Sequence, residues 1–317
     1  MSSLDNIRAA NAAWKPSYAP VAVFVGGTSG IGEGIVEAFA NHTNGKAHIY
    51  IVGRNVSAAS QIFARITPAP ASTSQSFKRE FVACDLSLVA NVKRAAGTIL
   101  ASHDRVNFLF MSAGAISLTV QDFTEEGLDR QLCQLYYSKW AWTDALLPAL
   151  RAAYAAGEDA RVAAIHTAGR GGPVDVQDIG LLKAMKGGFR KVGSLLSQMA
   201  SYQDLMAEGF AEHNPGITFT HTFPGEVNTP LLRNSPSAVV RGVYSLRHLL
   251  LRGFMSRAMP ISECGERQLY GLLHAPPGAS RFGGDGADIG MGGVDDPLWG
   301  EARTALWKHS EEVVSRR

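Results

Sequence analysis

The sequence predicts an α/β protein with a Rossmann-type, doubly wound parallel sheet, helices on both of its faces, and a C-terminal lid or extension. Two observations predict this class. Short apolar runs alternate with segments of helical periodicity along residues 20–230, and that alternation is typical of a parallel sheet covered on both faces. The first apolar run also leads directly into a glycine cluster that opens a helix. Ligands are therefore expected at the carboxyl ends of the strands.

The glycine cluster follows the expected first strand, Val21–Val25, and its glycines have the spacing Gly-x-x-x-Gly-x-Gly. Gly26 allows a tight turn, Gly30 lets the backbone approach a pyrophosphate, and Gly32 lets the helix pack closely on the strand. The helix that begins near Gly30 presents free N–H groups and its positive dipole end to an anion. The segment thus predicts a phosphate-binding turn.

The remaining elements follow the same alternation. Strands are expected at Ala47–Val52, Glu80–Ala83, Val106–Met111, Arg161–Ile165 and Ile217–Thr222, and helices at Val89–Ser102, Thr124–Tyr154, Leu195–Glu212 and Glu301–Val314. We interpret the chain as one NAD(P)-binding domain, with residues 1–19 as an N-terminal extension, 20–230 as the core and 231–317 as substrate lid and C-terminal extension.

Two stretches of the C-terminal part are less regular. The Gly/Asp/Pro-rich residues 275–297 are expected to form a surface excursion. Residues 239–257 have an amphipathic pattern that suits a lid or packed helix, or a helix lying on a membrane surface.

The amino-acid composition of the chain limits the classes of function that are expected for it. The chain has 317 residues, 46% of them hydrophobic, and 30 basic against 28 acidic residues; this near balance gives no reason to expect a nucleic-acid partner. Cys84, Cys133 and Cys264 have neither metal-ligand spacing nor an even count, which favours a reducing compartment and no metal site. The sequence shows no apolar leader and no apolar run of about 18 residues. A cytoplasmic protein without an integral membrane segment is expected.

Five motifs occur in a specific order: VGGTSGIG (25–32), CDLS (84–87), MSAG (111–114), RVAAIHTAG (161–169) and PGEVNTP (224–230). Together they resemble the short-chain dehydrogenase/reductase family over roughly residues 20–230, and the general likeness is to the divergent reductases abundant in fungi. Val25 stands where the family usually has threonine. That residue buttresses the turn without doing chemistry, so cofactor binding is expected to survive.

The resemblance implies a nicotinamide dinucleotide held by the glycine turn and by the ends of later strands. Asp85 and Leu86 would lie beside the adenine, Ser112–Gly114 under the ribose, and the 224–229 segment around the nicotinamide amide. Asp85 is equally interpreted as a helix cap and Pro224-Gly225 as a loop turn. The full expected set is Gly26, Thr28, Ser29, Gly30, Ile31, Gly32, Arg54, Asn55, Asp85, Leu86, Ser112, Ala113, Gly114, Pro224, Gly225, Val227 and Thr229.

The end of the second strand indicates which dinucleotide is bound. Enzymes that use NAD usually place a carboxylate there to bind the ribose 2′-hydroxyl. This chain has Arg54 instead, which pairs well with a 2′-phosphate, and Ser29 can add a hydroxyl donor. NADP(H) is therefore expected, the alternative being that Arg54 is an ordinary surface arginine.

Most of the family's catalytic set is missing. That set is a tyrosine, a lysine four residues later, a serine and an asparagine, and the Tyr-x-x-x-Lys slot falls near Leu196–Ala200, where neither residue occurs. Tyr202 has Met206 four residues on. The asparagine slot falls near Leu135.

Substitutes for the missing groups are Thr167, His166, Lys139 and Tyr136. Thr167 keeps a hydroxyl in the serine slot, and Lys139 lies one helical turn after Leu135. His166 can act as a general acid near neutral pH or be a structural histidine at a strand end. Tyr136 is either a proton donor or one member of an aromatic packing stripe.

The resulting hypothesis is an NADP(H)-dependent oxidoreductase that acts on a small apolar carbonyl, enone or imine metabolite, in secondary metabolism. Two alternatives stay open: an NADP(H)-binding sensor or scaffold without hydride transfer, and a redox-neutral cyclase or isomerase. The resemblance also implies a homodimer or homotetramer formed through the helices at Thr124–Tyr154 and Leu195–Glu212.

Overall fold

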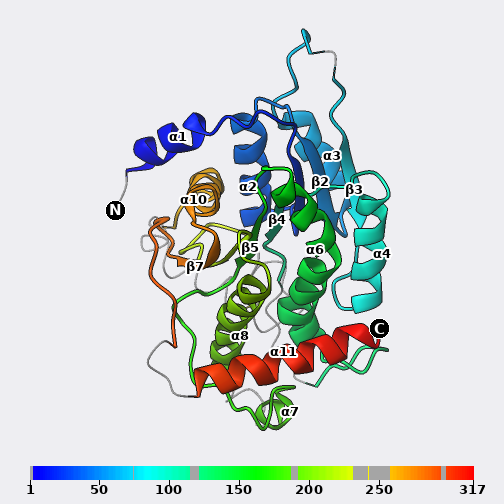
Figure 1. Ribbon diagram of the computed structural model, residues 1–317, viewed down its shortest axis with the longest axis vertical. Helices are drawn as coiled ribbons and strands as arrows, with labels where there is room; N and C mark the ends of the chain where they lie inside the picture. Colours follow the sequence, from blue (N-terminus) through cyan, green and yellow to red (C-terminus); the bar gives the residue numbers. More distant parts are fainter. Residues whose placement is uncertain are drawn as a thin grey trace.

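A seven-stranded, all-parallel sheet organises the computed structural model of the chain, which describes residues 3–73, 75–114, 121–186, 192–230, 242, 258–293 and 298–317. The strand order is β3-β2-β1-β4-β5-β6-β7, and the Rossmann-type prediction is confirmed (Figure 1). The strands are β1 (Val21–Val25), β2 (His48–Gly53), β3 (Arg79–Ala83), β4 (Phe108–Met111), β5 (Arg161–Ile165), β6 (Thr218–Thr222) and β7 (Gly278–Phe282).

The switch in strand order lies beside β1. Val25 pairs with Val52 of β2 on one side and with Met111 of β4 on the other. The chain therefore leaves β1 in one direction across the sheet and returns to build the other half, and a crevice opens at the carboxyl ends of these strands. All five residues of β1 are buried, as expected for a central strand covered on both faces.

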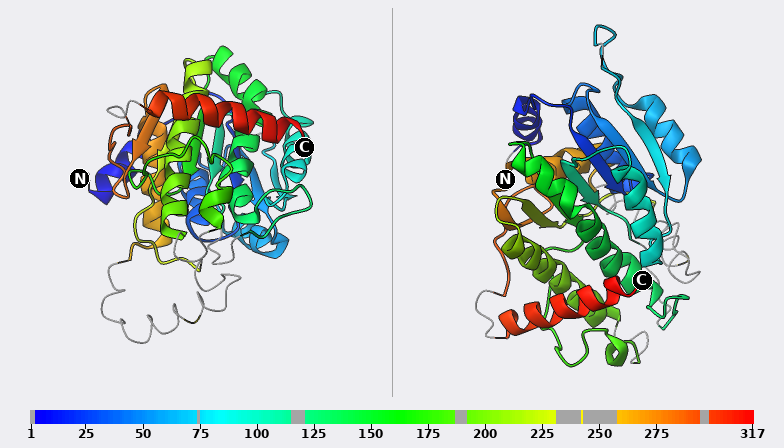
Figure 2. Two further views of the ribbon diagram at one scale, coloured as in Figure 1. Left: turned by 90° about the horizontal axis from the view of Figure 1, so that it is seen from below. Right: turned by 45° about the vertical axis from the view of Figure 1, so that its right-hand side comes forward.

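Helices cover both faces of the sheet (Figures 1 and 2). The apolar core on one face includes residues of α2, α3 and α10, and the core on the other face includes residues of α4, α6 and α8. The helices are α1 (Leu4–Ala13), α2 (Gly30–His42), α3 (Val56–Arg65), α4 (Val89–Leu100), α5 (Arg130–Leu132), the π-helical turn η1 (Cys133–Tyr137), α6 (Ser138–Ala155), α7 (Leu182–Met185), α8 (Val192–His213), α10 (Ile261–His274) and α11 (Trp299–Ser315).

The structure corrects several sequence-based expectations. The expected surface excursion 275–297 contains β7, which pairs in parallel with β6; its sequence, GASRF, lacks the apolar run of a buried strand because this edge strand is only partly buried. The helix expected from Thr124 starts at Arg130 and passes through a π turn. The N-terminal extension holds α1, and α10 was not predicted. The expected lid, residues 239–257, lies outside the described residues except for Gly242.

Helix α11 crosses α6 and α8 on the outside of the second face (Figures 1 and 2). Trp307 packs against Trp140 of α6 and Phe210 of α8, with ring centroids 5.8 and 4.9 Å apart, and stacks on His213 at 4.5 Å. These are the two helices expected to pair between subunits. A segment of the same chain covers this part of their surface.

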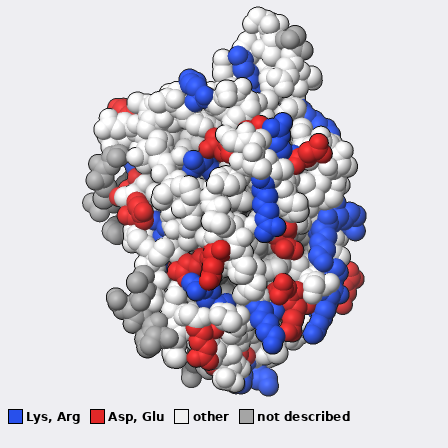
Figure 3. Space-filling model, viewed as in Figure 1, with Lys and Arg blue, Asp and Glu red and all other residues white. Residues whose placement is uncertain are grey.

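Surface charge is mixed. Basic and acidic side chains are interspersed on the face shown in Figure 3. Within the part of the chain that the structure describes, no helix is long and apolar enough to span a membrane, and no group of three His, Cys, Asp or Glu residues could hold a metal ion.

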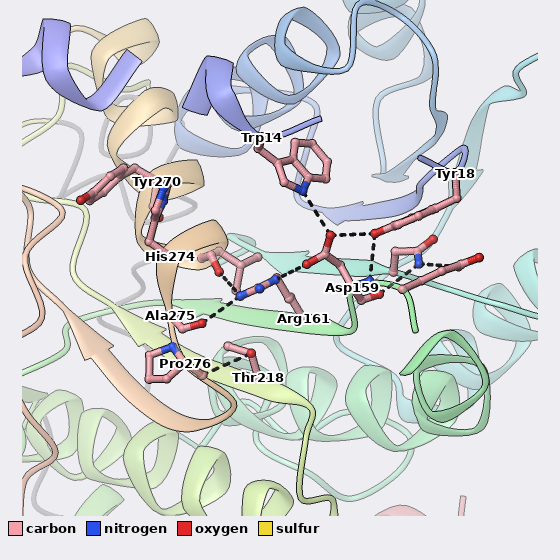
Figure 4. A network of polar contacts seen from close by, with 12 residues as sticks. Trp14, Tyr18, Asp159, Arg161, Thr218, Tyr270, His274, Ala275 and Pro276 are labelled. Carbon is pink, nitrogen blue, oxygen red and sulfur yellow. Dashed lines mark hydrogen bonds and ion pairs between the residues drawn. The ribbon is translucent and has the colours of Figure 1, made fainter. Parts of the chain in front are cut away.

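A polar clamp at the amino ends of the strands fixes the N-terminal segment to the sheet. The Asp159 carboxylate accepts hydrogen bonds from Trp14 Nε1 (3.1 Å), Tyr18 Oη (2.7 Å) and Arg161 Nε (2.7 Å) (Figure 4). Arg161 also donates to the carbonyl oxygens of Leu272 and Ala275 at 2.9 Å. Burial alone would raise the pKa of Asp159, but the hydrogen bonds from Arg161, Tyr18 and Trp14 outweigh it and hold the pKa below its ordinary value.

We expect Asp159→Asn to lower the free energy of unfolding by about 2–3 kcal/mol at pH 7, less than for a fully buried pair because the Asp159 side chain is 19% exposed. A carboxylate whose pKa is lower in the folded state than in the unfolded chain stabilises the fold at pH values above its unfolded pKa of about 3.9. That stabilisation is lost as the pH falls further, toward the folded-state pKa. Urea unfolding at several pH values measures this effect. The difference in free energy of unfolding between wild type and variant should be constant between pH 5 and 8 and should shrink below about pH 4.

The control is Asp122→Asn, which breaks the exposed ion pair with Arg130 and should cost less than about 1 kcal/mol. Equal losses for the two variants would contradict the assigned role of the clamp.

Candidate functional site

A cavity of about 240 Å³ opens at the carboxyl ends of β1, β2 and β4, where the strand order switches. It brings together most of the residues expected to bind the dinucleotide. Those that line it are Gly26, Thr28, Ser29, Gly30, Ile31, Gly32, Arg54, Asp85, Leu86, Ser112, Ala113, Gly114 and Thr229. Gly53, Cys84, Gln134 and Pro230 line it as well and were not predicted.

Backbone packing in the glycine turn shapes the cavity. Gly26 has φ +87°, and a Cβ there would lie 2.6 Å from the Ala113 backbone nitrogen. A Cβ on Gly32 would collide with the Gly26 carbonyl oxygen and the Ser112 hydroxyl. Both positions therefore need glycine for the turn to lie against the end of β4. The glycine spacing in the sequence reflects these two close approaches.

The amino end of α2 faces the cavity with unused donors. Ser29 is the N-cap residue, and its hydroxyl makes no capping hydrogen bond. The first N–H groups of a helix have no partner within the helix, and together with its dipole they attract an anion. Both Ser29 and Gly30 line the cavity, so this end of α2 suits the pyrophosphate of a dinucleotide.

Arg54 follows β2 at the rim of the cavity. Its side chain is exposed, and among the described residues no carboxylate forms an ion pair with it. The next residue, Asn55, does not line the cavity: its side chain caps α3 by accepting a hydrogen bond from Ala58 N at 3.0 Å. A capping amide has little freedom to reach a ligand. The structure therefore favours Arg54, and not Asn55, as the residue that would contact a ligand at this edge of the cavity.

Among the described residues of the loop after β6, Thr229 and Pro230 line the cavity. Pro224, Gly225 and Val227 come earlier in this loop and do not line the cavity, and Val227 forms a parallel bridge with Met259. On the other side of the cavity Asp85 serves two purposes, because it lines the cavity and its Oδ1 also accepts a hydrogen bond from Ser87 N at 3.0 Å. Its interpretation as a helix cap is wrong, because the N-cap residue of α4 is Leu88.

Three of the catalytic candidates meet at the carboxyl end of β5. Thr167 Oγ1 lies 2.9 Å from His166 Nδ1, and Lys139 Nζ donates to the Ile165 carbonyl oxygen at 2.9 Å. Lys139 is 2% exposed, and burial lowers its pKa to about 7. Burial, Lys139 and His221 together lower the pKa of His166 well below its usual value. His166 is therefore neutral at pH 7, which contradicts its expected use as a general acid in the resting protein.

A fully buried histidine beside this cluster was not predicted from the sequence. His221 in β6 pairs with Asp204 of α8 (Nδ1 to Oδ1, 2.7 Å), and Arg281 of β7 binds the other carboxylate oxygen at 3.1 Å. The signal for it was a histidine inside the buried strand TFTHT, which ends two residues before the PGEVNTP motif begins. Such a residue needs a polar partner on the covering helix, and helical spacing alone did not identify Asp204 as that partner.

Tyr136 is not part of the cluster at the end of β5. Its hydroxyl lies 2.7 Å from Ser310 Oγ in α11, and its ring is fully buried against Tyr137 and Tyr202. Tyr202 donates to the Ile179 carbonyl oxygen at 2.9 Å. The interpretation of Tyr136 as a packing residue fits these contacts, and its interpretation as a proton donor does not.

Comparison with known proteins agrees with this geometry. A family model described as short chain dehydrogenase matches residues 20–166. The oxidoreductase andH of Emericella variicolor is 35% identical over 73% of this chain and 65% of its own length, so the chain spans slightly less than two thirds of that relative. The oxidoreductase AN1596 of Emericella nidulans is 32% identical over 87% of this chain and 78% of its own length.

Solved structures show the same fold. An uncharacterised protein from Mycobacterium paratuberculosis aligns with a TM-score of 0.63 at 18% identity, over 96% of this chain and 97% of that one. The NADPH-bound carbonyl reductase from chicken fatty liver aligns with a TM-score of 0.54 at 17% identity, over 86% of this chain and 98% of that one. At such identities the likeness concerns the fold alone.

The depressed pKa of Lys139 makes stability depend on pH. Between about pH 7 and 10 the lysine is protonated in the unfolded chain and largely neutral in the folded one, so the unfolded state binds more protons and folding becomes more favourable as the pH rises. We expect Lys139→Met to exceed wild type in free energy of unfolding by an amount on the order of 4 kcal/mol near pH 6, with the difference vanishing near pH 10.

Chemical denaturation across this pH range measures the effect, with the exposed Lys308→Met as the control. A difference between Lys139→Met and wild type that does not change with pH would show that Lys139 keeps its ordinary pKa in the fold.

Proposed function

Because this chain belongs to the short-chain dehydrogenase/reductase family, we propose that it is an NADP(H)-dependent oxidoreductase that acts on a small apolar carbonyl, enone or imine metabolite. The family is one of oxidoreductases, and the proposal adds the cofactor, the substrate class and the residues that serve them. The likeness to fungal oxidoreductases supports a place in secondary metabolism, and we also propose a cytoplasmic location.

The observation that carries the cofactor proposal is Arg54 at the rim of the cavity. It follows β2, where a carboxylate would favour the unphosphorylated ribose, and no described acidic residue neutralises it. A guanidinium binds a 2′-phosphate through charge-assisted and bidentate hydrogen bonds. Ser29, whose hydroxyl makes no capping hydrogen bond to α2, would add a further donor.

The glycine turn fits the rest of the dinucleotide. The cavity has room for backbone contact because Gly26 and Gly32 carry no Cβ, and the first turn of α2 would bind the pyrophosphate. When bound, the nicotinamide supplies or accepts a hydride. The chain's own task is then to hold the substrate oxygen or nitrogen near Thr167 and to manage the accompanying proton.

We also propose that the chain forms a homo-oligomer. The family resemblance implies a homodimer or homotetramer that pairs through α6 and α8. In this chain, however, α11 lies across both helices. A homo-oligomer would therefore form through a different face from the one expected.

A second candidate function rests on the missing proton donor. The Tyr-x-x-x-Lys slot near Leu196–Ala200 is without tyrosine or lysine, and the nearby hydroxyls of Tyr202 and Tyr136 are bound to Ile179 and Ser310. A protein that binds NADP(H) without transferring hydride, as a sensor, scaffold or redox-neutral cyclase or isomerase, would need no such donor.

We expect Arg54→Gln to raise the Kd for NADPH by about 10–100-fold and to leave the Kd for NADH within about twofold, because the substitution removes a charge-assisted contact to the 2′-phosphate only. Fluorescence titration of both dinucleotides measures this. Arg316→Gln, which removes an exposed arginine of the C-terminal segment, is the control. Equal affinity of the wild type for NADPH and NADH would refute the assignment of Arg54.

Thr167 distinguishes the two candidate functions. If the chain transfers hydride, Thr167→Ala should lower NADPH consumption with ketones, enones or imines by about 10²-fold or more while Thr167→Ser retains most of it, because serine keeps the hydroxyl. Absorbance at the reduced nicotinamide band measures the rate. NADPH binding without turnover in the wild type would favour the second candidate, and unchanged turnover in Thr167→Ala would show that the proton is managed elsewhere.

A further inference from the structure

Two arginines at the carboxyl edge of the sheet have no hydrogen-bond or ion-pair partner for their guanidinium group in the part of the chain that the structure describes. One is Arg54, after β2, and the other is Arg170, in the loop after β5. The guanidinium of every other described arginine has an acceptor within reach, namely a carboxylate, a carbonyl oxygen or an asparagine side chain. Arg170 is therefore a cation without a described counterion.

A tight turn places Arg170 next to Thr167. Arg170 N donates to the Thr167 carbonyl oxygen at 3.1 Å, and Gly169 between them has φ +77°. These are the features of a β-turn with glycine at its third position, in which the first and fourth Cα atoms lie within about 7 Å of each other. The cationic side chain and the Thr167 hydroxyl thus start from one turn, within the span of a small ligand.

Close packing against α8 holds this loop in place. Ser201 Oγ accepts a hydrogen bond from Gly172 N at 2.9 Å and donates one to the Gly172 carbonyl oxygen at 2.6 Å, and Ser197 Oγ donates to the Arg170 carbonyl oxygen at 3.3 Å. A Cβ on Gly171 or Gly172 would lie 2.6 Å from one of these hydroxyl oxygens. The glycines let the loop lie on the helix, and in residues 168–172 only Arg170 has a side chain longer than a methyl group.

The Arg170 guanidinium lies over the ring of Phe223, with 4.2 Å between its Cζ and the ring centroid. Phe223 directly follows β6, and its backbone N donates to the Phe282 carbonyl oxygen at 2.8 Å. Contact with an aromatic face holds a cation by cation–π attraction and uses none of its N–H donors. Because Arg170 is exposed, these donors are available to a ligand that arrives from solvent.

The place of Arg170 along the sheet separates it from the site proposed for the 2′-phosphate. The strands between them run β2-β1-β4-β5-β6, so four strand spacings, about 19 Å, lie between the end of β2 and the end of β6. Arg170 is also not among the residues that line the cavity at the glycine turn. Its ligand would be a second anionic group, on the side of Thr167.

The surroundings of this cation are apolar. Ile289, in the loop after β7, is 42% exposed, and its Cδ1 lies 2.9 Å from the position that a Cβ on Gly169 would take. The ring of Phe223 lies against the guanidinium itself. A ligand that fits both features is apolar and carries one anionic group. A carboxylate matches a guanidinium in charge, and its two oxygens fit the fork of N–H donors.

We propose that Arg170 is a specificity-determining residue that binds a carboxylate of the substrate, so that the substrate is an apolar carbonyl, enone or imine compound that also carries a carboxylate. Thr167 would contact the reacting end of this molecule and Arg170 its carboxylate. The inference rests on the proposed function for the reaction and deepens it by naming the substrate class.

Matched pairs of probes test this inference without turnover. The probes are straight-chain acids that end in a methyl ketone, in a series of increasing chain length, each paired with its methyl ester. Binding is measured by titration calorimetry in the presence of excess NADP⁺, which cannot reduce them. Wild type should bind an acid about 10–100-fold more tightly than its ester, because only the acid makes charge-assisted hydrogen bonds to the guanidinium.

Arg170→Gln should bind acid and ester with affinities within about twofold of each other, and Arg170→Lys should keep a smaller preference for the acid, because an ammonium retains the charge but not the fork of donors. The Kd of the ester should be unchanged in both variants. Arg316→Gln, which removes an exposed arginine of the C-terminal segment, is the control and should keep the full preference.

Three results would overturn the inference. They are equal affinity for acid and ester in wild type, an acid preference that survives in Arg170→Gln, and no binding of any acid in the series. Loss of ester binding in Arg170→Gln would also overturn it, because the arginine would then hold the loop and not the carboxylate.

The same samples are titrated with NADPH, for which Arg170→Gln should leave the Kd within about twofold. A loss of NADPH affinity as large as the loss of acid affinity would assign Arg170 to the dinucleotide and overturn the inference. Absence of NADPH binding together with the expected acid preference would reject the proposed function and leave the carboxylate site standing. NADPH binding without an acid preference would reject the carboxylate site alone.

Discussion

The site depends on one steric constraint, the contact of backbone on backbone where the glycine turn meets the end of β4. Gly26 and Gly32 bring the turn against Ala113 and Ser112 at distances that no side chain permits. This contact fixes the start of α2 beside the ends of β1, β2 and β4, so the helix dipole, the Ser29 hydroxyl and Arg54 face one cavity. A methyl group at either glycine would separate the anion-binding end of α2 from the strands that complete the site.

The parts of the fold that were predictable are those whose sequence signal is local. Val21–Val25 and Arg161–Ile165 are strands with the expected bounds because a central strand contains an uninterrupted apolar run. β7 was missed because GASRF is held by pairing with β6 and not by its own apolar pattern. In the same way the glycine turn was evident from spacing, whereas the Asp204–His221 pair joins residues of different elements that only the folded chain brings together.

The end of β5 brings together an ammonium group, a hydroxyl and two imidazoles from different elements. A tyrosine and lysine on one helix would supply a donor and a charge at fixed spacing. Here the charge comes from α6 through Lys139, the hydroxyl from the end of β5 through Thr167, and the imidazoles from β5 and β6. Burial lowers the pKa values of Lys139, His166 and His221.

The position of α11 has a consequence for biosynthesis. Trp140, Phe210 and the tyrosines of η1 gain Trp307, His309 and Ser310 as partners only from this helix. While a ribosome is still making residues 298–317, the sheet and its inner helices can already assemble, but an aromatic strip on α6 and α8 stays open to solvent and to other nascent chains. In the interval before α11 docks, this aromatic strip is therefore available to chaperones.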